Sequence, residues 1–223
     1  MDWVVSCGVG AMRTRRPRDI TPLLSYGYRV NIGEYLGRGW DLLQPKLGIF
    51  AGYVLVLFGI SLALSFVPFV VGLIVNTIIS PPLYAGLFIV AHKLILEEPV
   101  EFGDFFKGFE KFGVFLAAGL VSSLLTFLGT LLCIVPGIYL GIAYSFTLLF
   151  IIDQGLEFWP AMENSRKLVT RNFFPMFGFL LLLGLINLGG AILCGLGLLL
   201  TVPLTYCAMT VAYMDIVDQV ARD

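Results

Sequence analysis

The chain has 223 residues, of which 58% are hydrophobic and only 13% are charged, and its mean hydropathy is +0.93. Soluble domains average roughly 25% charged residues, so this composition excludes a secreted or cytosolic enzyme domain. The net charge of −1 excludes the basic footprint of a nucleic-acid-binding module. We therefore expect the chain to lie in a lipid bilayer.

The N-terminal segment 1–46 is the most basic part of the chain. It holds seven of the fourteen Lys and Arg residues, including Arg13, Arg15 and Arg16. Positive residues in short flanking segments stay in the cytoplasm. We therefore expect a cytoplasmic tail over 1–31 and both termini in the cytoplasm. The expected location is a prokaryotic plasma (inner) membrane or an internal membrane derived from it.

Charged residues are absent from three long blocks, which are 47–92, 112–152 and 172–214. One spanning helix needs about 20 apolar residues, so each block is long enough for two spans and a tight turn. The sequence therefore predicts an all-α integral membrane protein, a six-helix bundle built from three helical hairpins. The charged joints between hairpins then share the face of the termini.

A short segment with helical periodicity precedes each hairpin. In Ile32–Leu43, Glu34 and Arg38 are spaced for an i,i+4 ion pair, Trp40 suits the membrane interface, and Pro45 ends the helix. In 158–170, Glu163 stands four residues before Lys167. We expect these segments to be amphipathic helices lying in the headgroup region.

The middle segment, 101–112, carries aromatic residues at spacings of three and four, with charged residues on its other side. That periodicity places the rings on one stripe facing the acyl chains. The residues expected to dock a partner or lipid on the three segments are Trp40, Phe102, Phe105, Phe106, Phe109, Phe158 and Trp159.

The three segments and the hairpins that follow them resemble one another. Thr77–Tyr84 matches Leu199–Tyr206, and Cys133–Tyr139 holds a similar place in the middle copy. We predict a single membrane domain over 32–218 with repeat-like units 32–98, 99–153 and 154–218, and a tail over 219–223. Chance similarity between apolar hairpins is the alternative.

Several polar residues fall at membrane depth, and prolines interrupt two predicted spans. Such residues line pathways in transporters, but Ser, Thr and Asn also bond between helices and prolines bend helices for packing. We favour the packing interpretation. The candidates for a polar pathway or helix kink are Asn76, Pro82, Asn187 and Pro203.

Two of the four cysteines, Cys133 and Cys194, fall in predicted outer turns of adjacent hairpins. A disulfide between them is feasible if that side of the membrane is oxidising. Buried small hydrophobic residues are the more common state of cysteines in such a chain.

Residues for catalysis are scarce. The one histidine, His92, lies beside Lys93 at the end of a block, and a zinc-protease helix needs two histidines four apart with a glutamate. No G-x-S-x-G motif is present. We expect no enzyme activity, no catalytic residues, no metal and no cofactor; an enzyme would have to depend on His92, Asp153 or Asp215.

Five stretches of the chain resemble a family of prokaryotic multi-pass membrane proteins related to the membrane domain of some glycerophosphodiester phosphodiesterases. They are Gly39–Leu43, Phe102–Phe109, Ile134–Leu140, Ser165–Val169 with Asn172–Phe174, and Gly195–Gly197 through Thr201–Leu204 to Ala212–Tyr213. The resemblance covers about 32–218 and implies an all-helical membrane protein with cytoplasmic amphipathic segments. It implies no reaction, because the hydrolase of some relatives is a separate soluble barrel.

The sequence thus favours a non-catalytic accessory or scaffold subunit of a larger membrane complex. The alternative is a carrier or permeation pathway for a neutral or lipid-like molecule. The expected partners are membrane lipids and other membrane subunits or a second copy, and no nucleic acid.

Overall fold

The computed structural model describes residues 3–4, 14–15, 28–192 and 195–219, and these residues are almost entirely helical. Apart from helices and the turns between them, the described residues include an antiparallel pair of two-residue strands, β1 (Trp3–Val4) and β2 (Thr14–Arg15). The predicted all-helical class is therefore confirmed for the described part of the chain.

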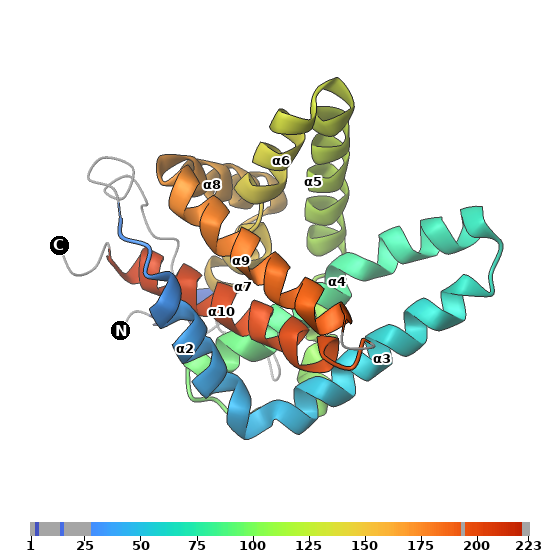
Figure 1. Cartoon of the computed structure of the whole chain (residues 1–223), viewed down its shortest axis with the longest axis horizontal. Coiled ribbons are helices and arrows are strands. Elements are labelled where there is room, and N and C mark those ends of the chain that lie inside the picture. Colours follow the sequence, from blue (N-terminus) through green and yellow to red (C-terminus); the bar gives the residue numbers. More distant parts are fainter. Residues whose placement is uncertain (1–2, 5–13, 16–27, 193–194, 220–223) are drawn as a thin grey trace. The chain divides into compact units, whose positions relative to one another are not determined.

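Figure 1 shows the helices in their order along the chain. In chain order they are α2 (Ile32–Leu43), the 3₁₀ turn η1 (Gln44–Lys46), α3 (Leu47–Ser65), α4 (Phe69–Ile95), the 3₁₀ helix η2 (Phe102–Phe109), α5 (Phe112–Leu132), α6 (Ile134–Ala143), α7 (Thr147–Gln154), α8 (Phe158–Arg171), α9 (Phe173–Ile192) and α10 (Leu198–Gln219). As expected, α2 ends just before Pro45, which lies in η1.

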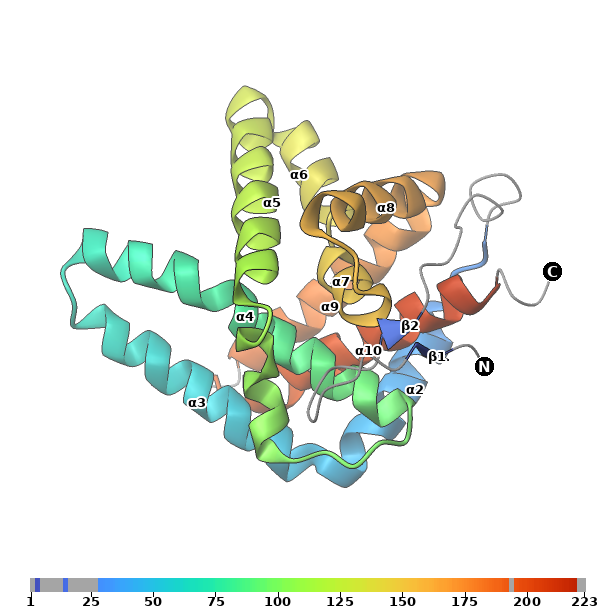
Figure 2. The ribbon, with the colours of Figure 1, turned by 180° about the vertical axis from the view of Figure 1, so that it is seen from behind.

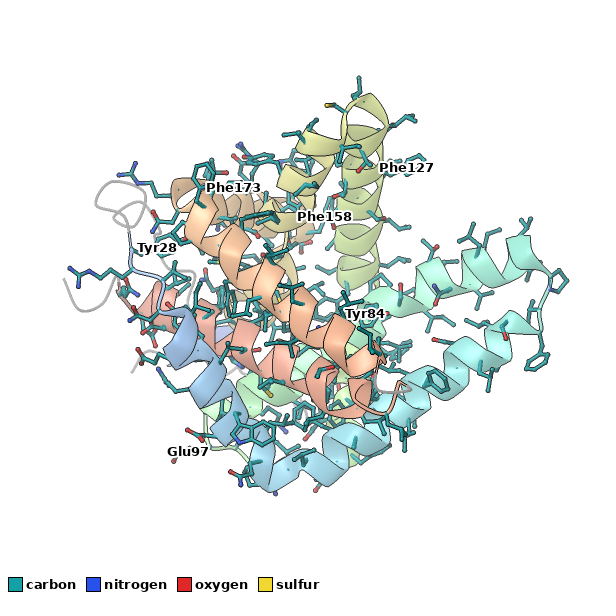
Figure 3. The ribbon with its side chains drawn as sticks, in the orientation of Figure 1. Tyr28, Tyr84, Glu97, Phe127, Phe158 and Phe173 are labelled. Atoms are coloured by element: carbon teal, nitrogen blue, oxygen red, sulfur yellow. The ribbon has the colours of Figure 1, made fainter. Side chains whose placement is uncertain are left out.

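Six helical segments among the described residues are long and apolar enough to cross a membrane, which gives the chain the character of a multi-pass membrane protein. They are Ile32–Ser65, Val70–Ile95, Phe112–Leu132, Ile134–Gln154, Phe173–Ile192 and Leu198–Gln219. Large apolar side chains stand exposed on them, such as Phe127 of α5, which is 65% exposed (Figure 3). A bilayer core is the solvent that such a surface requires.

The chain divides into two compact units, each assembled from segments distant in sequence. One comprises 31–112 and 178–212 and is called unit 2; the other comprises 1–30, 113–177 and 213–223 and is called unit 1. Their boundaries differ from the three repeat-like units, which stay a prediction.

The core of unit 2 is an aromatic cluster where α3, α4 and η2 meet. The Tyr53 ring stacks on Phe105 at a centroid distance of 4.3 Å, and Phe50 meets the same ring edge-on at 5.2 Å. The Tyr53 hydroxyl donates a hydrogen bond to the Leu83 carbonyl at 2.9 Å. This bond satisfies the hydroxyl of Tyr53, whose side chain is fully buried among apolar groups.

Two glycines allow η2 to lie directly on the α4 backbone. A Cβ atom on Gly108 would overlap the Pro82 carbonyl oxygen, and one on Gly86 would overlap that of Phe105. Pro82 is buried at this contact. The sequence predicted a kink or a pathway at Pro82, and in the structure that residue packs against η2.

In unit 1, the span predicted for the second half of the middle hairpin is broken. A turn over 144–146 separates α6 from α7, and α8 packs along both (Figure 2). The Ser165 hydroxyl donates to the Ala143 carbonyl at 2.7 Å and accepts from the Phe146 N–H at 3.2 Å. One side chain of α8 therefore bonds a carbonyl and an N–H at the break, as the absence of water in a membrane requires.

We predict that Gly108→Ala lowers the free energy of unfolding by about 1–3 kcal/mol, because the added methyl group forces η2 away from α4. The measurement is the thermal midpoint in mild detergent. Gly103→Ala, in the same element, is the control, because a Cβ there meets nothing within 4 Å. Equal midpoints for the two variants would show that the contact does not stabilise the fold.

Candidate functional site

The structure leaves most of the residues expected to dock a partner or lipid accessible. Those exposed are Trp40, Phe102, Phe106, Phe109 and Trp159, and Phe158 is half-buried at the start of α8 (Figure 3). For Trp40 the local reason is clear: a Cβ on the adjacent Gly39 would lie 2.9 Å from the Ala208 backbone. Because α2 contacts α10 at Gly39, the side chain of Trp40 lies on the exposed side of α2.

Phe105 differs from its expected role. Its side chain is fully buried between Phe50 and Tyr53, so it is not available to a partner or to lipid. The aromatic spacing suggested an α-helix with all its rings on one stripe, but η2 has 3₁₀ geometry over Phe102–Phe109. With 3.0 rather than 3.6 residues per turn, the rings spread over more than one side of the helix.

Asp104 is the most highly connected charged residue of unit 2. Its carboxylate accepts the Glu101 N–H at 2.9 Å, and the Glu101 side chain accepts the Asp104 N–H in return, which forms a capping box. The same carboxylate lies 2.8 Å from the Nζ atoms of both Lys93 and Lys107. Asp104 thus links the end of α4 to the start of η2.

The electrostatics follow from this geometry. Burial alone would raise the pKa of Asp104, but hydrogen bonds from the Glu101 backbone, Lys107 and Lys93 outweigh it and lower the pKa to about 2. The hydrogen bond to Asp104 also raises the pKa of Lys107 above its ordinary value. Asp104 and Lys107 are therefore both charged at neutral pH and form an ion pair at 2.8 Å.

An open groove lies at the turn between α3 and α4. The groove has a volume of about 480 Å³. The residues that line it are Ser61, Leu64, Ser65, Val67, Gly72, Leu73 and Asn76. Ser61 and Ser65 donate to the Leu57 and Leu62 carbonyls, at 3.0 and 2.6 Å. The Asn76 amide is exposed and makes no hydrogen bond in the described part of the chain.

The other candidates for a polar pathway lie deeper in unit 2. Asn187 donates from Nδ2 to the Leu183 carbonyl at 3.1 Å and to the Thr205 hydroxyl at 2.8 Å. Its Oδ1 atom is buried without a hydrogen-bond partner, as is the Thr201 hydroxyl. Pro203 is buried within α10. No hydrogen bond joins this α9–α10 group to Asn76 or Pro82 among the described residues.

A buried polar group in unit 1 includes Asp153, which the sequence singled out only as a residue that an enzyme would require. The Tyr213 hydroxyl donates to the Asp153 carboxylate at 3.1 Å and accepts from the Gln154 amide at 3.2 Å. Asp153 is completely buried. Asp153 follows an uncharged block, and that was its only signal in the sequence. The contact itself could not be predicted, because its partner Tyr213 lies 60 residues away.

The predicted disulfide remains a prediction. Cys133 is exposed between α5 and α6, and Cys194 lies outside the described residues.

The chain is similar to uncharacterised mycobacterial proteins. It is 29% identical over 122 residues to a protein of Mycobacterium bovis and to one of Mycobacterium tuberculosis, and 28% identical to another from M. tuberculosis. These matches cover 54% of this chain and 37% of each relative. The chain therefore spans little more than a third of the length of these relatives. No family model and no solved structure matches it.

We predict that Asp104→Asn lowers the free energy of unfolding at neutral pH by about 3 kcal/mol, because it leaves Lys93 and Lys107 without their carboxylate. Because the folded pKa lies below the unfolded value of about 3.9, the stabilisation is complete above about pH 4 and is lost towards pH 2. Thermal unfolding of the parent and Asp104→Asn across this range measures both effects.

The control for this experiment is Glu110→Gln, a change of equal charge at an exposed residue of the same segment. Its midpoint should remain close to that of the parent at every pH. If Asp104→Asn loses as much stability between pH 4 and pH 2 as the parent does, another carboxylate causes the acid effect.

Proposed function

We propose that this protein is a non-catalytic accessory or scaffold subunit of a larger membrane complex. The observation that carries the proposal is the unbonded amide of Asn76 in a helix apolar enough to span the membrane. An unsatisfied polar group in hydrocarbon costs several kcal/mol, and neighbouring helices commonly supply the missing bond.

The apolar residues around Asn76 do not distinguish lipid from protein. Leu73, Ile74 and Phe58 are exposed on the α3–α4 pair, and acyl chains would cover them as well as a partner helix would. The amide does distinguish them, because acyl chains offer no hydrogen bond. A transmembrane helix that packs against this groove would both cover the apolar surface and bond to Asn76.

Asn76 differs from the neighbouring hydroxyl groups, which are hydrogen-bonded within their own helices. Thr77 donates to the Leu73 carbonyl at 2.8 Å, and Ser61 and Ser65 bond to carbonyls of their own helix. Each of these groups is satisfied within one turn and needs nothing from outside. Asn76 is the polar residue of the groove that a partner would recognise.

A carrier for a neutral or lipid-like molecule is the second candidate, favoured by one observation. The hydroxyls of Ser145 and Thr147, at the break between α6 and α7, are buried without partners, like Asn187 Oδ1 and the Thr201 hydroxyl in unit 2. Broken spans with free polar atoms frame substrate sites in some transporters. A carrier requires that Thr147→Val and Asn187→Leu abolish flux in liposomes without unfolding the protein.

For the membrane arrangement, we propose three helical hairpins, each preceded by a helix in the headgroup region, within a prokaryotic plasma membrane or one derived from it. We also propose a relation to the membrane domain of glycerophosphodiester phosphodiesterases, based on the stretches quoted above and without any hydrolase activity. The support is the three uncharged blocks of the sequence and the helix boundaries that follow them.

The proposed orientation predicts that tags at both termini react only after the cytoplasmic side is opened. The reason is the concentration of Lys and Arg in 1–46. Labelling of tagged intact cells with a membrane-impermeant reagent, compared with permeabilised cells, measures this. Labelling of either terminus in intact cells would contradict the orientation.

We predict that Asn76→Leu abolishes co-purification of the partner subunit while the protein itself stays folded. The measurement is native mass spectrometry after extraction from its own cells in mild detergent. Thr77→Val is the matched control, since that hydroxyl is satisfied within α4. A parent protein that is always alone would overturn the accessory-subunit proposal, and equal loss in both variants would remove Asn76 from the contact.

A further inference from the structure

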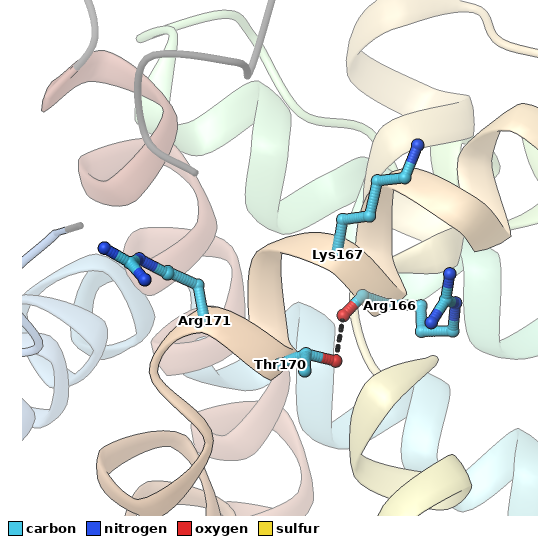
Figure 4. A pocket seen from close by; sticks show the side chains of 4 residues that line it. All are labelled: Arg166, Lys167, Thr170 and Arg171. Carbon is cyan, nitrogen blue, oxygen red and sulfur yellow. Dashed lines mark hydrogen bonds between the residues drawn. The ribbon is translucent and has the colours of Figure 1, made fainter. Parts of the chain in front are cut away.

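A basic pocket lies at the end of α8, in unit 1. Arg166, Lys167, Thr170 and Arg171 line it, and its volume is about 340 Å³ (Figure 4). Three of these four residues are cations, brought together by their spacing along the last turns of one helix. The pocket is large enough for a phosphate group with its ester substituents.

The carboxylate of Glu163 lies beside two of these cations, Arg166 and Lys167. Glu163 bonds to Arg166 through both carboxylate oxygens, at 2.8 and 3.0 Å, and lies 3.4 Å from Lys167 Nζ. The hydrogen bond from Arg166 lowers the pKa of Glu163, and the same bond raises the pKa of Arg166. Arg166 and Lys167 thus share one carboxylate, so this pair keeps an excess of positive charge over Glu163. Such an excess attracts a multivalent or phosphate-type anion.

Aromatic and apolar groups border the cations. The Tyr139 hydroxyl lies 2.7 Å from that of Thr170, and the Tyr139 ring lies 5.5 Å from that of Phe173. Phe173 begins the candidate span α9 two residues after Arg171, and the adjacent Phe174 is 83% exposed. A basic site directly before a spanning helix lies at the depth of lipid headgroups.

We propose that this pocket binds the phosphate of an anionic phospholipid, whose acyl chains lie against the aromatic start of α9. Arg166, Lys167 and Arg171 supply the N–H donors for the phosphate oxygens. Thr170 donates its proton to the Arg166 carbonyl at 2.6 Å, so it positions that residue's helical turn rather than donating to the ligand. A free phosphate anion would bind to the same cations. The aromatic side chains next to the pocket favour the lipid, because acyl chains can pack against them.

The test uses the full-length protein in neutral detergent, with phosphatidylglycerol, phosphatidylcholine or inorganic phosphate added. Native mass spectrometry counts the bound lipid, and the thermal midpoint reports binding of each probe. The variant is Lys167→Gln with Arg171→Gln, which keeps the Arg166–Glu163 pair intact. The control is Lys46→Gln with Lys111→Gln, which removes the same charge elsewhere.

We expect the parent to retain phosphatidylglycerol in preference to phosphatidylcholine, and the pocket variant to bind it about 10- to 30-fold more weakly. The control should bind as the parent does. Equal weakening in both double variants would show non-specific charge attraction and overturn the proposal. Equal stabilisation by inorganic phosphate at the same concentration would assign the pocket to a free anion. Should the double variant not purify folded, Arg171→Gln alone is measured against Lys111→Gln with the same criteria.

Discussion

One carboxylate, that of Asp104, organises the charged joint of unit 2. It caps η2 through the Glu101 N–H and holds Lys93, near the end of α4, and Lys107 of η2 at 2.8 Å. With η2 held there, Gly108 lies against Pro82 and Phe105 enters the aromatic cluster beside Tyr53. The ion pair and the close backbone contact therefore hold η2 in the same place, and its Phe102, Phe106 and Phe109 rings stay partly exposed.

The lack of water in a bilayer explains where the polar side chains bond. Thr77, Ser61 and Thr130 each donate to a carbonyl four residues earlier in their own helix, so they add no demand for a partner. Ser165 uses the same chemistry between helices, to replace bonds lost at the break after Ala143. Against this background the unbonded amide of Asn76 is informative, whereas exposed leucines of the same helix are not.

The sequence predicted what depends on local periodicity and charge. Both ends of α2 and α8 and the start of α3 fall at or next to the expected residues, and the Glu34–Arg38 and Glu163–Lys167 pairs form at 3.6 and 3.4 Å. It did not predict the break between α6 and α7 or the burial of Phe105. Both depend on residues far along the chain, Ser165 in one case and Tyr53 in the other, and periodicity carries no information on such contacts.

The break in the middle hairpin bears on the choice between scaffold and carrier. A span that opens and closes during transport needs a break whose backbone can exchange partners. Here the Ala143 carbonyl and the Phe146 N–H are both bonded to Ser165, and Phe146 and Phe150 pack beside Tyr213. A break fixed in this way holds one bend in place. The unbonded hydroxyls of Ser145 and Thr147 are buried beside this fixed bend, where a moving substrate has no access to them.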